Sequence, residues 1–205
     1  EKDYKRRGDW LVIIKTLCLL LLAFFFHQTS IVLFFILIVY LFPLNNTIRL
    51  LLVLFSMCLF LFPGIATMAT GRVSMFIQMN EMRLGNIEDY AGDVRIGLTN
   101  IYLAIVSFFY IYCSKFIVNI KERRKYSLVL DLYVIGVLLT ALFSHIEAGV
   151  RLGLLLTFFE FLMPAILLRN VNGSRRSTII SVVIVFVIMN IVKLLTNVPS
   201  LWYYL

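Results

Sequence analysis

Long apolar runs alternate with short polar segments along the chain, and this pattern predicts helices that cross a membrane. A straight helix needs about 20 residues to cross the roughly 30 Å hydrocarbon core. The second and third runs are shorter, so we expect them to tilt or to extend into their polar flanks. The predicted fold is all-α, a polytopic transmembrane helix bundle whose seven spans lie near residues 11–26, 29–42, 48–62, 98–117, 127–143, 151–168 and 178–194.

The first two spans are predicted to form a tight hairpin. Taken together, residues 11–42 would make a straight helix of about 48 Å, which is too long for one crossing. The polar sequence HQTS at 27–30 interrupts this run. His27 then closes the first helix on the outer side, and the Ser or Thr that follows is a natural N-cap for the second helix. A histidine at such a turn also has a purely structural interpretation, as a capping or interfacial residue.

One long stretch, residues 63–97, separates the third predicted span from the fourth and forms an outer loop. A loop of this length in a compact bundle is usually functional or disordered. On a helical wheel, residues 72–88 divide into a polar and an apolar side, which predicts an amphipathic helix in the outer interface. Arg72 and Arg83 both project from the apolar side of this helix, an unusual position for charges that only improve solubility.

The composition excludes an ordinary soluble domain. Hydrophobic residues make up 61% of the chain, charged residues 15%, and the mean hydropathy is +0.96, whereas apolar residues are about half of a soluble domain. The three cysteines are scattered within apolar runs, which excludes a disulfide framework or a thiolate metal site. Because the chain opens with Glu1 rather than Met, we expect residues 1–205 to be a single transmembrane domain that lacks amino-terminal spans of a longer protein.

The basic residues predict the orientation, because cytoplasmic loops carry an excess of Lys and Arg. With the amino terminus inside and the carboxyl terminus outside, twelve of the nineteen basic residues face the cytoplasm, and anionic lipid headgroups are their expected partners. Merging the first two spans would place the basic run 121–125 outside. The net charge of +8 does not indicate a nucleic-acid partner, because no basic groove with interleaved aromatic residues is present. The inner set is Lys2, Lys5, Arg6, Arg7, Arg49, Lys121, Arg123, Arg124, Lys125, Arg169, Arg175 and Arg176.

Four arginines remain on the predicted outer face, namely Arg72, Arg83, Arg95 and Arg151. Arginine offers paired N–H donors to phosphate oxygens, so arginines in the outer interface are suited to binding a lipid-linked phosphate. The structural alternative for Arg72 and Arg83 is that they extend to lipid headgroups without a further role.

A second polar cluster, SHIEAGVRLG at 144–153, lies at the outer end of the fifth span. Glu147 and Arg151 are four residues apart, the spacing that brings side chains together on a helix. His145 can accept a proton or donate to a phosphate. The alternative is an ion pair at the start of a helix, beside an interfacial histidine.

Among the charged residues of the apolar runs, Glu160, Lys15 and Asp131 are the ones we expect to be costly inside the bilayer. Asp131 is expected to pair with the basic cluster Arg123–Lys125, and Lys15 is expected to reach the inner interface, so both have structural interpretations. Glu160 lies in the middle of the sixth span. It is either neutral and hydrogen-bonded inside the bundle, which we favour, or part of the lining of a substrate cavity.

Two motifs occur in a recognisable order. The sequence FHQTS at 26–30 joins two apolar helices, and an outer-face Arg opens the helix VRLGLLLTFFEFLMPAILL at 150–168. The first resembles the aromatic-His-x-Ser/Thr hairpin of the EpsG-like branch of the Wzy O-antigen and exopolysaccharide polymerases, and the second resembles the carboxyl-terminal half of that family. The resemblance implies a multi-pass glycosyltransferase of the bacterial inner membrane, which polymerises undecaprenyl-pyrophosphate-linked oligosaccharides on the outer face.

On this resemblance, the cations would stabilise the pyrophosphate leaving group and a base would take the acceptor proton. The candidate catalytic residues are His145, Glu147 and Arg151, and the candidate pyrophosphate-binding residues are Arg72, Arg83, Arg95 and His27. No cofactor and no metal are expected, although Glu88, Asp89 and Asp93 have the oxygen ligands for a divalent ion. The expected partners are the lipid-linked oligosaccharide and membrane lipids, with chain-length regulators or flippases as candidate protein partners.

A non-enzymatic function is the alternative. A flippase or transporter of the same lipid-linked glycans would bind the headgroup through the same arginines without chemistry, and a scaffold would only hold a partner. Transporters commonly contain paired repeats and helices broken near the middle of the membrane. In this sequence, only Gly136 and Pro164 are candidate breaks.

Overall fold

The structure is a computed structural model, and it describes residues 14–21, 31–62, 64–71, 98–144, 147–170 and 175–196. Every regular element in these residues is helical, which confirms the predicted all-α class. Short helices cover residues 14–21 and 64–71. The labelled helices are α2 (Ile31–Leu41), α3 (Asn46–Leu61), α5 (Leu98–Cys113), α6 (Ile120–Leu142), α7 (Glu147–Thr157), α8 (Leu162–Asn170) and α9 (Arg175–Thr196), with 3-10 turns η2 (Ser114–Phe116) and η3 (Phe158–Phe161).

Two helical runs in the described residues, Ile120–Leu142 and Gly149–Asn170, are long and apolar enough to cross a membrane. The pair Asn46–Leu61 and Gly64–Gly71 bends by 104° and adds a third span if it is counted as one. The described part of the chain therefore supports a membrane protein with two or three full-length spans, fewer than the seven predicted. Several apolar helices in these residues are short, since α2 has 11 residues and α3 and α5 have 16 each, and much of the predicted span at 11–26 lies outside the described residues.

Asparagine caps fix where two of the helices begin. The Asn45 side chain accepts a hydrogen bond from the Ile48 N–H at 2.8 Å and starts α3. The Asn119 side chain accepts from the Lys121 N–H at 3.0 Å and starts α6. Such caps satisfy backbone donors that have no partner in the first turn. As a result, the polar sequence after Asn119 is the first turns of a long helix rather than a loop.

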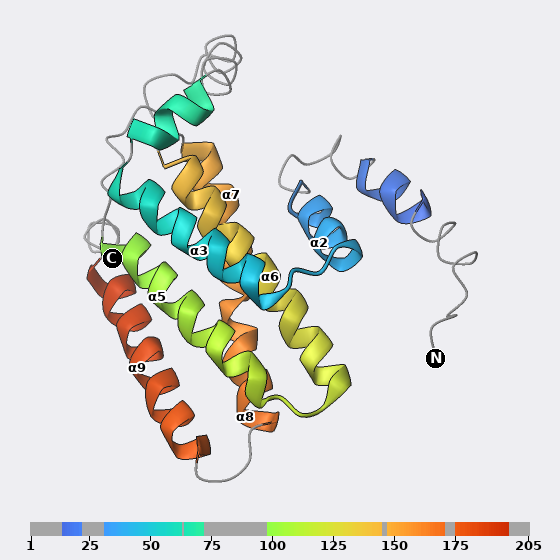
Figure 1. Cartoon of the computed structure of the whole chain (residues 1–205), viewed down its shortest axis with the longest axis vertical. Coiled ribbons are helices and arrows are strands. Elements are labelled where there is room, and N and C mark those ends of the chain that lie inside the picture. The colour runs from blue at the N-terminus through green and yellow to red at the C-terminus, as the bar shows by residue number, and fades with distance from the viewer. Residues whose placement is uncertain are drawn as a thin grey trace, which may run out of the picture.

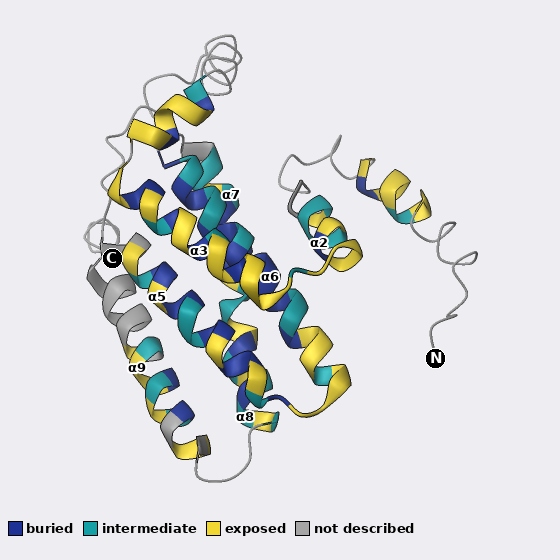
Figure 2. Cartoon of the chain, in the orientation of Figure 1, coloured by how far each residue is buried: buried dark blue, intermediate teal, exposed yellow. Residues whose placement is uncertain are grey.

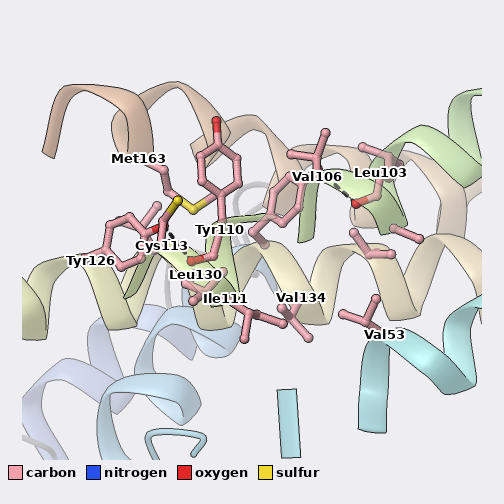
Figure 3. Close-up of a cluster of buried hydrophobic side chains, with 14 of the residues drawn as sticks. Val53, Leu103, Val106, Tyr110, Ile111, Cys113, Tyr126, Leu130, Val134 and Met163 are labelled. Atoms are coloured by element: carbon pink, nitrogen blue, oxygen red, sulfur yellow. Dashed lines mark hydrogen bonds between the residues drawn. The ribbon is translucent and has the colours of Figure 1, made fainter. Parts of the chain in front are cut away.

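Helix α6 is the centre of the bundle, with α3, α5 and α7 packed along it (Figure 1). Two buried tyrosines attach α6 to α5. The Tyr126 hydroxyl donates to the Tyr110 carbonyl at 2.8 Å, and the Tyr133 hydroxyl donates to the Leu103 carbonyl at 3.3 Å. Higher residue numbers on α6 meet lower numbers on α5, so the two helices are antiparallel. Figure 3 shows the apolar core around these side chains, including Met163 of α8.

Glycines allow α7 to approach α6 closely. A Cβ atom on Gly136 would lie 2.7 Å from the Gly153 carbonyl oxygen, and a Cβ on Gly153 would lie 2.2 Å from Thr140 Oγ1. Gly136 is thus a contact point between helices, and α6 continues unbroken through it. Gly149 and Gly153 are also four residues apart, a spacing that favours close helix packing in membranes.

The helical run after Gly149 changes from α-helix to a 3-10 turn before Pro164. Residues 158–161 form the 3-10 turn η3, and α8 follows directly. Proline has no N–H to donate to the carbonyl four residues earlier, which here is that of Glu160. In a 3-10 segment each hydrogen bond joins residues three apart instead of four, and this change accommodates the missing donor. The irregular part of this helical run therefore contains Glu160, the acidic residue of the span.

Large apolar side chains cover the outside of the bundle. Leu51 on α3, Ile105 on α5 and Phe158 in η3 are 60%, 52% and 68% exposed. Figure 2 shows exposed positions along the outer faces of several helices, while the buried positions face α6. A water-soluble protein rarely exposes apolar surface so widely. These faces are suited to contact lipid.

Candidate functional site

The predicted outer-face site lies mostly outside the described residues. This holds for His27, Arg72, Arg83, Arg95 and His145. Two members of the set belong to α7: Glu147 is its first residue, with a side chain that is not described, and Arg151 lies one turn later with an exposed side chain. The proposed convergence of the four arginines therefore stays a prediction.

Arg151 and the basic residues of α6 lie at opposite ends of the bundle. Helix α6 has 23 residues, which corresponds to a length of about 34 Å. Helix α7 packs back along α6, with Gly149 against Phe143 and Gly153 against Gly136. The start of α7 is therefore next to the end of α6, far from the basic first turns of α6 (Figure 1). About one membrane thickness separates these two ends.

Glu160 lies near two tyrosines of the core. It lies in η3, half-buried, where its carboxyl group is close enough to the Tyr133 hydroxyl to interact with it, and it is also near Tyr110. Whether this carboxyl group is neutral inside the bundle or lines a substrate cavity stays a prediction.

The most densely connected polar group in the described residues joins α3 to α6. Arg49 Nε donates to Asp131 Oδ1 at 2.5 Å, and both side chains are buried. Arg49 Nη1 donates to Asn46 Oδ1 at 2.5 Å, and Arg49 Nη2 donates to the Ser127 hydroxyl. The other carboxylate oxygen of Asp131 accepts from the Leu44 backbone N–H at 3.2 Å. Both charges are therefore paired and further hydrogen-bonded, which is the condition under which a buried ion pair is tolerated.

The prediction that Asp131 pairs with the Arg123–Lys125 cluster is wrong. Those three side chains are exposed in the first turns of α6, whereas Asp131 is fully buried and faces α3. Lys125 instead pairs with Glu122, with Lys125 Nζ 3.0 Å from Glu122 Oε1. From the sequence alone, Arg49 is one of many basic residues of the inner face. A signal was available, because Arg49 and Asp131 are opposite charges within two separate apolar runs.

Two half-open cavities flank this ion pair, and both are lined by Arg124 and Ser127. One has a volume of about 430 Å³, and most residues of its lining are polar: Asn45, Asn46, Arg49, Ser114, Ile120, Arg123, Arg124, Tyr126 and Ser127. The other, of about 500 Å³, combines cations with an apolar wall: Val39, Tyr40, Pro43, Arg124, Lys125, Ser127, Leu128 and Asp131 line it. Both cavities can receive an anion, since arginine and lysine side chains border them.

No group of three or more His, Cys, Asp or Glu residues suited to a metal ion occurs in the described ranges. Cys18, Cys58 and Cys113 are free thiols. Among the described residues, the groups available to bind a ligand are thus chiefly arginines, lysines, hydroxyls and amides.

The helical fold and its apolar exterior define an integral membrane protein. Over residues 11–205 the sequence matches the model of the EpsG family, so the chain belongs to the EpsG family. This confirms the resemblance found in the sequence and places the chain among membrane proteins of polysaccharide biosynthesis. No curated protein and no solved structure gives a significant match to the chain.

Proposed function

We propose that this protein is a bacterial polymerase of O-antigen or exopolysaccharide, which uses a lipid-pyrophosphate donor on the outer face of the inner membrane. The observation that carries the proposal is the family match, which extends over nearly the whole chain, residues 11–205. The position of Arg151 supports the assignment of the site, because it lies at the end of the bundle opposite the basic turns of α6.

The full proposal includes seven spans with the amino terminus inside. The first turns of α6, with Arg123, Arg124 and Lys125, then face the cytoplasm, as the positive-inside rule favours. The start of α7 faces outward. Arg151 is consequently on the side where lipid-linked oligosaccharides are polymerised in this proposal.

The reaction is a glycosyl transfer. A hydroxyl oxygen of the acceptor unit attacks the anomeric carbon of the donor glycan, and the bond from that carbon to the pyrophosphate oxygen breaks. The hydroxyl proton passes to His145 or Glu147 as general base. Arg72, Arg83, Arg95 and Arg151, with His27, neutralise the negative charge that develops on the undecaprenyl pyrophosphate as it leaves. The arginines in this way supply the charge that a metal ion supplies in other enzymes.

A flippase or transporter of the same lipid is the competing function, and the two make different products. The test uses the purified full chain in liposomes that contain undecaprenyl-pyrophosphate-linked repeat units. A polymerase converts these units into a ladder of longer glycans. Movement of the units across the bilayer without any longer glycan would instead support transport, and neither product would support a scaffold.

A further inference from the structure

Two neighbouring cavities border the Arg49–Asp131 pair, and we call them together the inner basic pocket. Arg124 and Ser127 belong to the lining of both cavities. One side of the pocket is polar, with Asn46 and Ser114 joined by a hydrogen bond of 3.3 Å. The other side is apolar, with Val39 from α2 and Leu128 from α6. A ligand that fits both sides has a polar end and an apolar end.

The pocket has an excess of positive charge. The Arg49 charge is balanced by Asp131, and the Lys125 charge is balanced by Glu122. In the described part of the chain, Arg123 and Arg124 have no carboxylate partner. Their side chains are exposed at the mouth of the pocket. Both arginines line the polar cavity, and guanidinium groups bind phosphate oxygens through paired N–H donors.

In the proposed orientation, the pocket lies at the cytoplasmic end of α6, where the headgroups of the inner leaflet would be. It surrounds the first turns of α6, which is one of the membrane-length helices. Next to the pocket, the apolar surface continues along α2, where Tyr40 is 71% exposed. A phospholipid whose phosphate is bound at Arg123 and Arg124 would place its acyl chains against the apolar wall formed by Val39 and Leu128. Basic pockets between helices at a cytoplasmic membrane face are suited to anionic lipid headgroups.

We propose that the inner basic pocket binds an anionic phospholipid of the inner leaflet, with its phosphate between Arg123 and Arg124. The apolar wall favours a lipid over a free phosphate ion, because free phosphate would leave that wall exposed to water. The bound lipid contacts both α2 and α6, and it therefore stabilises the packing of α2 against the bundle. This site is distinct from the proposed polymerase site, which is at the other end of α6.

The test measures lipid binding to the purified full chain in detergent by native mass spectrometry, with phosphatidylglycerol as the probe and phosphatidylcholine as the neutral lipid. The variant is Arg123→Gln/Arg124→Gln. The matched control is Lys121→Gln, which removes one exposed charge in the same turns of α6 but does not line the pocket. We expect affinity for phosphatidylglycerol to fall about fivefold for each arginine removed, so about 25-fold in the double variant, and little in the control.

Further measurements distinguish a lipid headgroup from free phosphate as the ligand, and they include a variant that keeps the positive charges. Arg123→Lys/Arg124→Lys keeps the charge but loses the paired N–H donors, so it should bind phosphatidylglycerol more tightly than the Gln variant and less tightly than the unmodified chain. Inorganic phosphate at equal concentration should not displace the lipid, whereas displacement would mean that the pocket is a site for free anions. Equal loss of binding in the double variant and in Lys121→Gln would overturn the proposal, as would equal binding of phosphatidylcholine to the unmodified chain.

Discussion

Arg49 on α3 and Asp131 on α6 form a buried ion pair, with Arg49 Nε 2.5 Å from Asp131 Oδ1, although 82 residues separate them in the chain. The contact connects the amino-terminal helices to the central helix of the bundle. Asn46, Ser127 and the Leu44 backbone N–H complete the hydrogen bonds of the two charges. The pair thus holds α3 against α6 at the end of the bundle where the inner basic pocket lies.

Removing one partner of this pair should destabilise the protein strongly. Arg49→Met leaves the Asp131 carboxylate buried without its cation, and we expect a loss of about 3–5 kcal/mol in the free energy of unfolding. The double variant Arg49→Met/Asp131→Leu removes both charges and should recover most of this loss. Chemical denaturation in detergent provides the measurement.

The matched control for the ion pair is Lys125→Gln, which breaks the exposed pair with Glu122. An exposed pair of this kind contributes about 0–1 kcal/mol. If Arg49→Met and Lys125→Gln reduce stability equally, the Arg49–Asp131 contact does not hold α3 to α6 in the way described.

The close contact of α6 and α7 predicts that Gly153 tolerates no side chain. A Cβ at this position would lie 2.2 Å from Thr140 Oγ1 and 2.7 Å from the Gly136 carbonyl oxygen, so Gly153→Ala must push the helices apart. We expect a loss of about 1–3 kcal/mol, the usual cost of overpacking. Gly64→Ala is the control, because a Cβ there meets no atom within 4 Å. Thermal unfolding with equal midpoints for the two variants would argue against this packing.

The buried tyrosine hydroxyls should each contribute measurable stability. Tyr126→Phe removes the hydroxyl that donates to the Tyr110 carbonyl at 2.8 Å, and it leaves that oxygen without this donor in the core. We expect a loss of about 1–2 kcal/mol. The control is Tyr112→Phe, since Tyr112 is 57% exposed, and its loss should be smaller. Denaturation curves test the difference, and a larger effect at Tyr112 would contradict the assignment of the core.

The sequence predicts the helices of this protein better than it predicts their contacts. Apolar runs located the helices, because hydrophobic length is a local property. The apolar run predicts a span at 127–143, whereas α6 begins at Ile120, because the cap at Asn119 starts the helix within a polar segment. The spacing of Gly149 and Gly153 is visible in the sequence, but its meaning depends on Gly136 and Thr140 of another helix.

The partner of Asp131 was predicted incorrectly for a similar reason. Proximity along the chain favoured Arg123–Lys125, yet the side chain faces α3, and that orientation follows from tertiary packing. For the candidate outer site, the sequence supplied residue types and the order of motifs. The described structure adds the position of Arg151 at the start of α7.

The proposed orientation predicts which cysteines react from outside the cell. In a chain whose native cysteines are replaced by alanine, Arg151→Cys should react in intact cells with a thiol reagent that does not cross membranes. Lys121→Cys should react only after the membrane is opened, because the first turns of α6 face the cytoplasm in this orientation. Reaction of both positions in intact cells, or of Lys121→Cys alone, would contradict the proposed topology.

The central claim is that this chain polymerises a lipid-linked glycan and that Arg151 stabilises the departing pyrophosphate. The most direct measurement is the rate of ladder formation by the reconstituted protein with Arg151→Ala. Losing one group that stabilises transition-state charge typically slows a reaction about 100- to 1,000-fold, and we expect a decrease of that size. Arg169→Ala, an exposed arginine in the last turn of α8, should leave the rate unchanged. Ladders that form equally fast with Arg151→Ala would contradict the account.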